Sequence, residues 1–141
     1  MQPATYVVFD HTADVGLEIQ APTLASLFET AALGLFDLIT DVRGIGTGLE
    51  RAVSVSAADR EELLVRWLAE LLYLHDGEGF VFSRFEIESI TDTHLGARAW
   101  GEPFDPARHP VKTELKAVTY HQTSVRNGPG GGWVARVVLD V

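Results

Sequence analysis

The chain has 141 residues, 46% of them hydrophobic and 22% charged, with a formal net charge of −9 at pH 7. Such a composition is typical of a globular domain with a sizeable core, and it argues against tight direct binding of RNA or DNA, which needs a basic surface. The absence of cysteine excludes disulfides, thiolate zinc sites and cysteine nucleophiles. No apolar run approaches the ~18 residues of a membrane span, and the N-terminus lacks the basic and apolar blocks of a signal peptide. We therefore expect a cytoplasmic protein without membrane contact.

The first half of the chain predicts strands and two helices. Residues 6–9 have strand composition, and residues 15–20 alternate apolar and polar side chains, as a strand buried on one face does. Apolar residues recur at helical spacing over residues 24–35, directly after a threonine that suits an N-cap. Residues 51–56 alternate again, and residues 59–77 carry the strongest apolar helical stripe of the chain.

The second half of the chain predicts mostly β-structure. Four segments alternate or are rich in β-branched and aromatic residues: 80–90, 93–101, 115–121 and 133–141. A proline-rich irregular stretch (103–110) and a glycine-rich hairpin loop (127–132) interrupt them. We therefore expect one α+β domain over residues 1–141, with a mostly antiparallel or mixed sheet of about six or seven strands packed with two main helices.

Two aspartates near the ends of the chain form the first candidate site. Asp14 closes the segment Phe9-Asp10-His11-Thr12-Ala13-Asp14, and Asp140 precedes the last residue, Val141. Period-two alternation directs Asp140 away from the face that carries Trp133. If the fold brings these segments together, the two carboxylates and the chain end suit a hard divalent cation. The alternative is a structural turn, in which Asp14 and Thr12 bond nearby backbone N–H groups.

Lys116 is the second candidate, because it stands between apolar residues in a predicted strand. It could contact a phosphate or a partner's carboxylate, or it could be an exposed cation that protects an edge strand from aggregation. The five histidines lack the spacing of a zinc site. Neither glycine-rich loop is followed by the Lys-Ser/Thr of a phosphate-binding loop, and no Gly-x-Ser-x-Gly elbow is present.

Four segments in this order resemble the archease family over nearly the whole chain: residues 9–16, 63–72, 114–121 and 137–141. The resemblance implies a non-enzymatic accessory protein of RtcB-type RNA ligases, which join 2′,3′-cyclic-phosphate or 3′-phosphate ends to 5′-hydroxyl ends. Such proteins promote guanylylation of the ligase histidine and sustain multiple turnover in tRNA splicing and RNA repair.

The same resemblance assigns a metal site to Asp14, Asp140 and Val141 and a functional role to Lys116. Calcium is the expected ion in a structure, with magnesium or manganese possible in the cell. Four further residues are expected to support the ligands or contact the partner: Asp10, His11, Thr12 and His121.

Two other functions remain open from the residues alone. One is a small metal-dependent hydrolase, in which Asp14 and Asp140 hold the cation and His11 is the general base. The other is a chaperone-like binding module, which requires a sizeable exposed apolar patch.

Overall fold

A computed structural model describes residues 3–11 and 14–141. In this part of the chain, seven strands accompany two α-helices and two short 3-10 turns. In chain order they are β1 (Thr5–His11), β2 (Asp14–Ala21), α1 (Leu24–Ile39), η1 (Val42–Gly44), β3 (Leu49–Ser56), α2 (Arg60–Asp76), β4 (Phe80–Ile90), β5 (His94–Pro103), β6 (Ala117–Asn127), η2 (Pro129–Gly131) and β7 (Trp133–Asp140).

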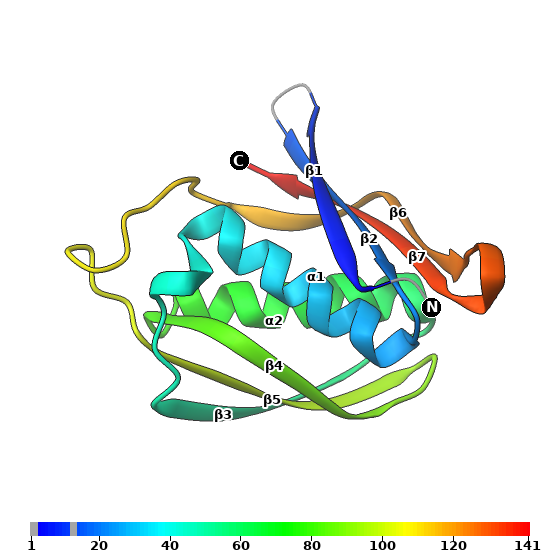
Figure 1. Ribbon diagram of the computed structural model, residues 1–141, viewed down its shortest axis with the longest axis horizontal. Helices are drawn as coiled ribbons and strands as arrows, with labels where there is room; N and C mark the ends of the chain where they lie inside the picture. Colours follow the sequence, from blue (N-terminus) through cyan, green and yellow to red (C-terminus); the bar gives the residue numbers. More distant parts are fainter. Residues whose placement is uncertain (1–2, 12–13) are drawn as a thin grey trace.

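The strands form two sheets with the helices between them (Figure 1). One sheet has the order β1-β2-β7-β6 and the other β3-β5-β4, and neighbouring strands are antiparallel throughout. The expected α+β fold, with antiparallel strands and two helices, is confirmed. The division of the strands into two sheets is a feature that the sequence analysis did not specify.

The two helices begin where the sequence predicts. The Thr23 hydroxyl accepts a hydrogen bond from the Ser26 N–H at 3.1 Å, and the Asp59 carboxylate accepts one from the Glu62 N–H at 2.8 Å. These bonds satisfy N–H groups that the first helical turn leaves without partners. Inside the core, the fully buried Trp67 donates its indole N–H to a main-chain oxygen of α1 at 2.9 Å, so the two helices are tied by a polar bond as well as by packing.

Each helix also supplies a glutamate to the edge of a sheet. Glu61 of α2 accepts the N–H of Val125 in edge strand β6 at 2.9 Å. Glu29 of α1 accepts the N–H of Ile87 in edge strand β4 at 2.8 Å. Both bonds occupy main-chain donors that would otherwise be open to pairing with another strand.

Strand β6 differs from its expected range of 115–121. It begins at Ala117 and continues to Asn127, with an irregular register between Thr119 and Ser124 and a positive φ of 56° at Gln122. This bulge interrupts the apolar–polar alternation, which explains why the sequence pattern stops near residue 121 while the strand goes on. Among the described residues, no helix is long and apolar enough to cross a membrane.

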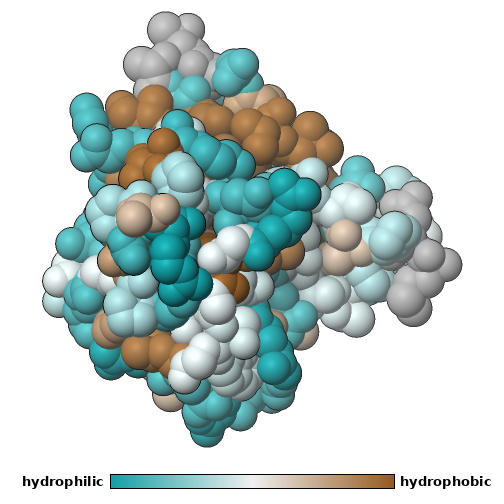
Figure 2. Space-filling view, turned by 60° about the vertical axis from the view of Figure 1, so that its left-hand side comes forward, coloured by the Kyte–Doolittle hydropathy of each residue, from teal (hydrophilic) through white to brown (hydrophobic). Residues whose placement is uncertain are grey.

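The β1–β2 hairpin projects from the body of the molecule (Figure 1). Its first strand carries two large apolar side chains in contact with solvent, since Val7 is 64% and Val8 44% exposed. Figure 2 shows hydrophobic surface gathered just below the end of this hairpin.

Candidate metal centre

Asp14 and Asp140 lie directly opposite each other on neighbouring strands. Strands β2 and β7 are antiparallel, and their register pairs Asp14 with Asp140 without a bulge along the whole ladder. Directly opposed residues of an antiparallel pair project their side chains from the same face of the sheet. The two carboxylates that were expected to converge are therefore neighbours; that they bind a metal stays a prediction.

The type of strand pairing brings these two side chains especially close. The N–H of Lys116 donates to the carbonyl of Asp140 at 2.8 Å, so the main-chain groups of Asp140 point toward β6 and away from β2. Asp14 and Asp140 consequently form a non-hydrogen-bonded pair. In such pairs the Cα atoms are about 4.5 Å apart, closer than in the hydrogen-bonded kind. Like charges at this spacing destabilise a sheet unless a cation or proton compensates them.

The donor set at this position suits a hard divalent cation. Asp14 is partly buried and Asp140 is exposed, so solvent reaches the Asp140 residue more freely than Asp14. Among residues 3–11 and 14–141, no cluster of three His, Cys, Asp or Glu side chains is placed to hold a metal. A main-chain oxygen of the adjacent, exposed Val141 and water could complete the ligands of a cation held by the two carboxylates.

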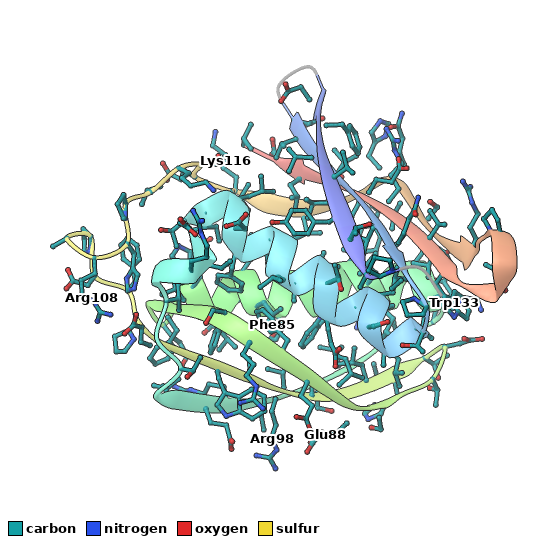
Figure 3. All side chains as sticks on the ribbon, in the orientation of Figure 1. Phe85, Glu88, Arg98, Arg108, Lys116 and Trp133 are labelled. Carbon is teal, nitrogen blue, oxygen red and sulfur yellow. The ribbon has the colours of Figure 1, made fainter. Side chains whose placement is uncertain are left out.

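Two of the expected supporting residues lie beside this pair. His11 is opposite Asp14 on β1, and only its main chain is described. Lys116 is exposed and immediately precedes β6, whose first residue is paired with Asp140; Figure 3 shows it close to the end of β7. Lys116 is therefore bound through its main chain to Asp140 and lies at the same end of the sheet as the two carboxylates.

The other expected residues are less directly connected. Asp10 is exposed and pairs with Val15, one position out of phase with Asp14, so the pleat directs it to the opposite face of the sheet. His121 is exposed in the irregular part of β6. Thr12 lies outside the described residues.

The structure places a further group of residues on the same face of the sheet as the two carboxylates, farther along the strands, and sequence reasoning missed it. The ring of Phe9 lies over Gly16, in the space where a Cβ atom on that glycine would be. The guanidinium of Arg136 stacks on the same ring, 3.9 Å from its centroid, and lies 3.5 Å from the Glu18 carboxylate. Reading alternate residues of the expected strands as one face would have placed Gly16 and Glu18 beside Asp14, and Arg136 beside Asp140.

A second polar cluster is centred on Glu102 near the end of β5 and includes residues of the loop that follows. Glu102 accepts hydrogen bonds from the Gly46 N–H at 2.7 Å, from His109 Nε2 at 2.8 Å and from Arg108 at 2.9 Å. These donors, first of all the Gly46 N–H, lower the pKa of Glu102 to about 2. His109 is fully buried, and its Nδ1 accepts the Asp105 N–H at 2.9 Å, which places its proton on Nε2. Figure 3 shows Arg108 on the loop that extends away from the first hairpin.

The fold and the paired carboxylates define a small α+β protein with an acidic candidate site for a hard cation. The profile of the "Archease protein family (MTH1598/TM1083)" matches residues 6–141. The chain belongs to this family.

Relatives of known name support this assignment. The chain is 44% identical over 136 residues to "Protein archease" of Pyrococcus furiosus, covering 94% of this chain and 96% of that protein. It is 40% identical over 144 residues to "Protein archease" of Methanosarcina mazei, covering 99% and 98%.

Solved structures share the fold. The solution structure of Methanobacterium thermoautotrophicum protein 1598 matches with a TM-score of 0.83 and 37% identity, covering 96% of this chain and 98% of that one. The crystal structure of a Thermotoga maritima archease, described as a possible chaperone, matches with a TM-score of 0.61 and 23% identity, over 94% of each chain. The second likeness bears on the fold alone.

Proposed function

We propose that the protein is a non-enzymatic activator of an RtcB-type RNA ligase, which promotes guanylylation of the ligase and its multiple turnover in tRNA splicing or RNA repair. Membership of the archease family supports an accessory role of this kind. The observation that carries the proposal is the opposed pair Asp14 and Asp140, because two carboxylates side by side on one face of a sheet suit a hard divalent cation.

The position of this pair supports action on a partner. The pair lies on β2 and β7 toward the end of a hairpin that projects from the molecule (Figure 1). A projecting, narrow element is suited to entering a cleft of another protein, whereas a site of the protein's own would ordinarily lie in a concave pocket. The carboxylates would then act inside the ligase rather than on a substrate bound by this protein alone.

Asp14, Asp140 and an oxygen of Val141 would hold the divalent cation, which is calcium, magnesium or manganese in this proposal. When bound, the cation would supply Lewis-acid stabilisation of phosphate charge during guanylyl transfer. The chain's own contribution is to fix the two carboxylates at the spacing of the β2–β7 pair and to offer the Lys116 ammonium nearby for a phosphate oxygen.

The charge of the protein suits a basic partner. Its net charge of −9 would attract a ligase surface that is positive because it binds RNA. Direct binding of this protein to RNA is not part of the proposal, because an acidic surface repels phosphates. The association should therefore weaken as the salt concentration rises.

An RNA-ligation assay tests the proposal. The cognate ligase is given GTP, Mn²⁺ and an RNA with 2′,3′-cyclic-phosphate and 5′-hydroxyl ends, with and without substoichiometric amounts of this protein. We expect ligation limited to about one turnover without it and many turnovers with it. Glu86→Gln is the matched control for Asp140→Asn in this assay, because Glu86 is also an exposed carboxylate but lies on β4, in the other sheet.

The assay also separates the other two functions. Hydrolysis by this protein alone, without the ligase, would favour a metal-dependent hydrolase. Suppression of aggregation of unrelated proteins, together with no effect on ligation, would favour a chaperone-like module. Either outcome would overturn the proposed activation.

A further inference from the structure

The outer edge of β1 differs from the other edges of the two sheets. Strands β6 and β4 each have a main-chain N–H covered by a helix glutamate, as described above. Strand β3, the remaining edge of the second sheet, carries charged residues, among them Glu50 and Arg51, which hold ion pairs with Arg98 and Glu78. Charged and covered edges resist pairing with further strands. Within the described residues, the apolar middle of β1 has neither a covering glutamate nor a charged residue.

The register identifies the main-chain groups that this edge offers. Because Asp14 and Asp140 form a non-hydrogen-bonded pair, the main-chain groups of Asp14 point toward β1, and alternation then turns those of Tyr6, Val8 and Asp10 outward. Within residues 3–11 and 14–141, β1 has no main-chain hydrogen bonds besides those of its ladder with β2. Three N–H and three C=O groups are thus presented in a row.

The edge is apolar and held in position. Val7 and Val8 project to opposite faces of the strand and are 64% and 44% exposed, so both sides of this edge offer apolar surface. The Tyr6 hydroxyl donates to the Asp37 carboxylate of α1 at 2.7 Å, which fixes the strand against the body of the protein. A preordered strand loses little conformational entropy when another segment pairs with it.

We infer that the outer edge of β1 is the docking edge for an extended segment of the ligase, which joins the sheet as a further strand. The segment would carry apolar side chains beside Val7 and Val8 and a lysine or arginine near Asp10. Charge argues for this occupant over a second copy of the chain, since each copy has a net charge of −9 and the same acidic hairpin end. The choice of the ligase rests on the proposed function; the open edge does not.

Amide hydrogen exchange gives the direct test. In the free protein, the amides of Val7 and Phe9 are bonded to β2 and should exchange slowly, while those of Tyr6, Val8 and Asp10 should exchange fast. Addition of the cognate ligase should slow exchange at Tyr6, Val8 and Asp10 by at least about tenfold, because each gains a hydrogen bond. A complex that leaves these three amides unchanged would overturn the inference.

A pair of variants at one position tests the same edge by affinity. Val8→Pro removes an outward N–H without removing a β1–β2 bond, whereas Val8→Thr keeps the N–H and nearly the same shape. We expect Val8→Pro to bind the ligase about tenfold more weakly than Val8→Thr, with both variants melting close to the wild type. Equal affinities of two folded variants would contradict a docked strand.

The outcomes keep this inference apart from the proposed function. Val8→Pro should recover full stimulation of ligation at saturating concentration, because Asp14 and Asp140 are intact. If the ligase slows amide exchange at the outer edge of β1 but ligation is not stimulated, the activator role is wrong and the docking edge is supported. Protection that depends on the concentration of this protein in the absence of ligase would identify a second copy as the occupant and overturn the inference.

Discussion

Glu102 and the Asp14–Asp140 pair show two ways in which one chain places its carboxylates. Glu102 is surrounded by donors from the chain itself, with Gly46, His109 and Arg108 all within 2.9 Å. Asp14, by contrast, has a second carboxylate as its direct cross-strand neighbour. The first arrangement stabilises the fold through hydrogen bonds, whereas the second sets two like charges on one face of the sheet, where they repel each other and suit a cation. The comparison teaches that an anion's immediate neighbours separate a structural site from a candidate functional one.

The largest effect should come from removing one of the paired carboxylates. Asp140→Asn keeps the shape of the side chain but removes its charge, so the cation would be lost. We expect stimulation of ligation to fall at least about 100-fold, while stability changes by less than about 0.5 kcal/mol because the residue is exposed. Ligation rates and a urea titration measure the two quantities. Normal stimulation by this variant would remove the basis for the metal site.

Divalent cations should stabilise the folded protein through the same pair. Calcium or manganese at about 100 times its dissociation constant should raise the free energy of unfolding by about 2.7 kcal/mol, because it binds the folded state. Thermal melts with and without the cation measure this effect. Asp140→Asn should abolish it, and a shift of the same size in that variant would place the cation elsewhere.

Glu102→Gln should show the opposite behaviour to Asp140→Asn. The loss of charge-assisted bonds should lower the free energy of unfolding by about 1–3 kcal/mol and leave stimulation of ligation unchanged. The pKa of Glu102 is lowered from 4.5 to about 2, so its ionised form stabilises the fold above pH 4.5. That contribution should disappear as the pH falls from 4.5 to about 2. Urea titrations over this pH range should show the free energies of unfolding of the wild type and the variant converging. A difference that stays constant with pH would contradict the stabilising role of ionised Glu102.

The smallest effect should come from the bond that holds β1 to α1. Tyr6→Phe removes the hydroxyl that donates to Asp37 and should cost about 1 kcal/mol of stability. Burial, and then the bond to Asp37, raise the pKa of Tyr6 from 10.0 to about 12, so this stabilisation is complete below pH 10 and is lost as the pH rises through about 12. Urea titrations at pH 7 and pH 11 measure both effects. An unchanged stability at pH 7 would show that the bond does not anchor the hairpin.

Much of the fold was predictable because its signals are local. The apolar stripes of α1 and α2 and their caps at Thr23 and Asp59 lie within single segments of sequence. The alternation of β7 placed Asp140 on the face away from Trp133, and the register of β2 and β7 then set it opposite Asp14. In these places the helical or strand period alone determines which side chains share a face.

The remaining features depend on contacts between distant segments. The bulge that extends β6 rests on Gln122, whose positive φ no alternation pattern reveals. The cluster of Glu102 joins Gly46 to His109 across an irregular stretch, so no spacing predicts it. The stacking of Arg136 on Phe9 likewise needs β1 and β7 to lie in one sheet, on the two sides of β2. Topology, rather than composition, decides all three.

The glutamates that cover β6 and β4 link the melting of each helix to aggregation of the protein. Glu61 and Glu29 belong to α2 and α1, so a helix that loosens also withdraws the group covering a strand edge. Partial melting would then create a surface that recruits other chains before the core is exposed. Irreversible aggregation on heating should accordingly begin below the midpoint of global unfolding, at the stage where helix ends fray.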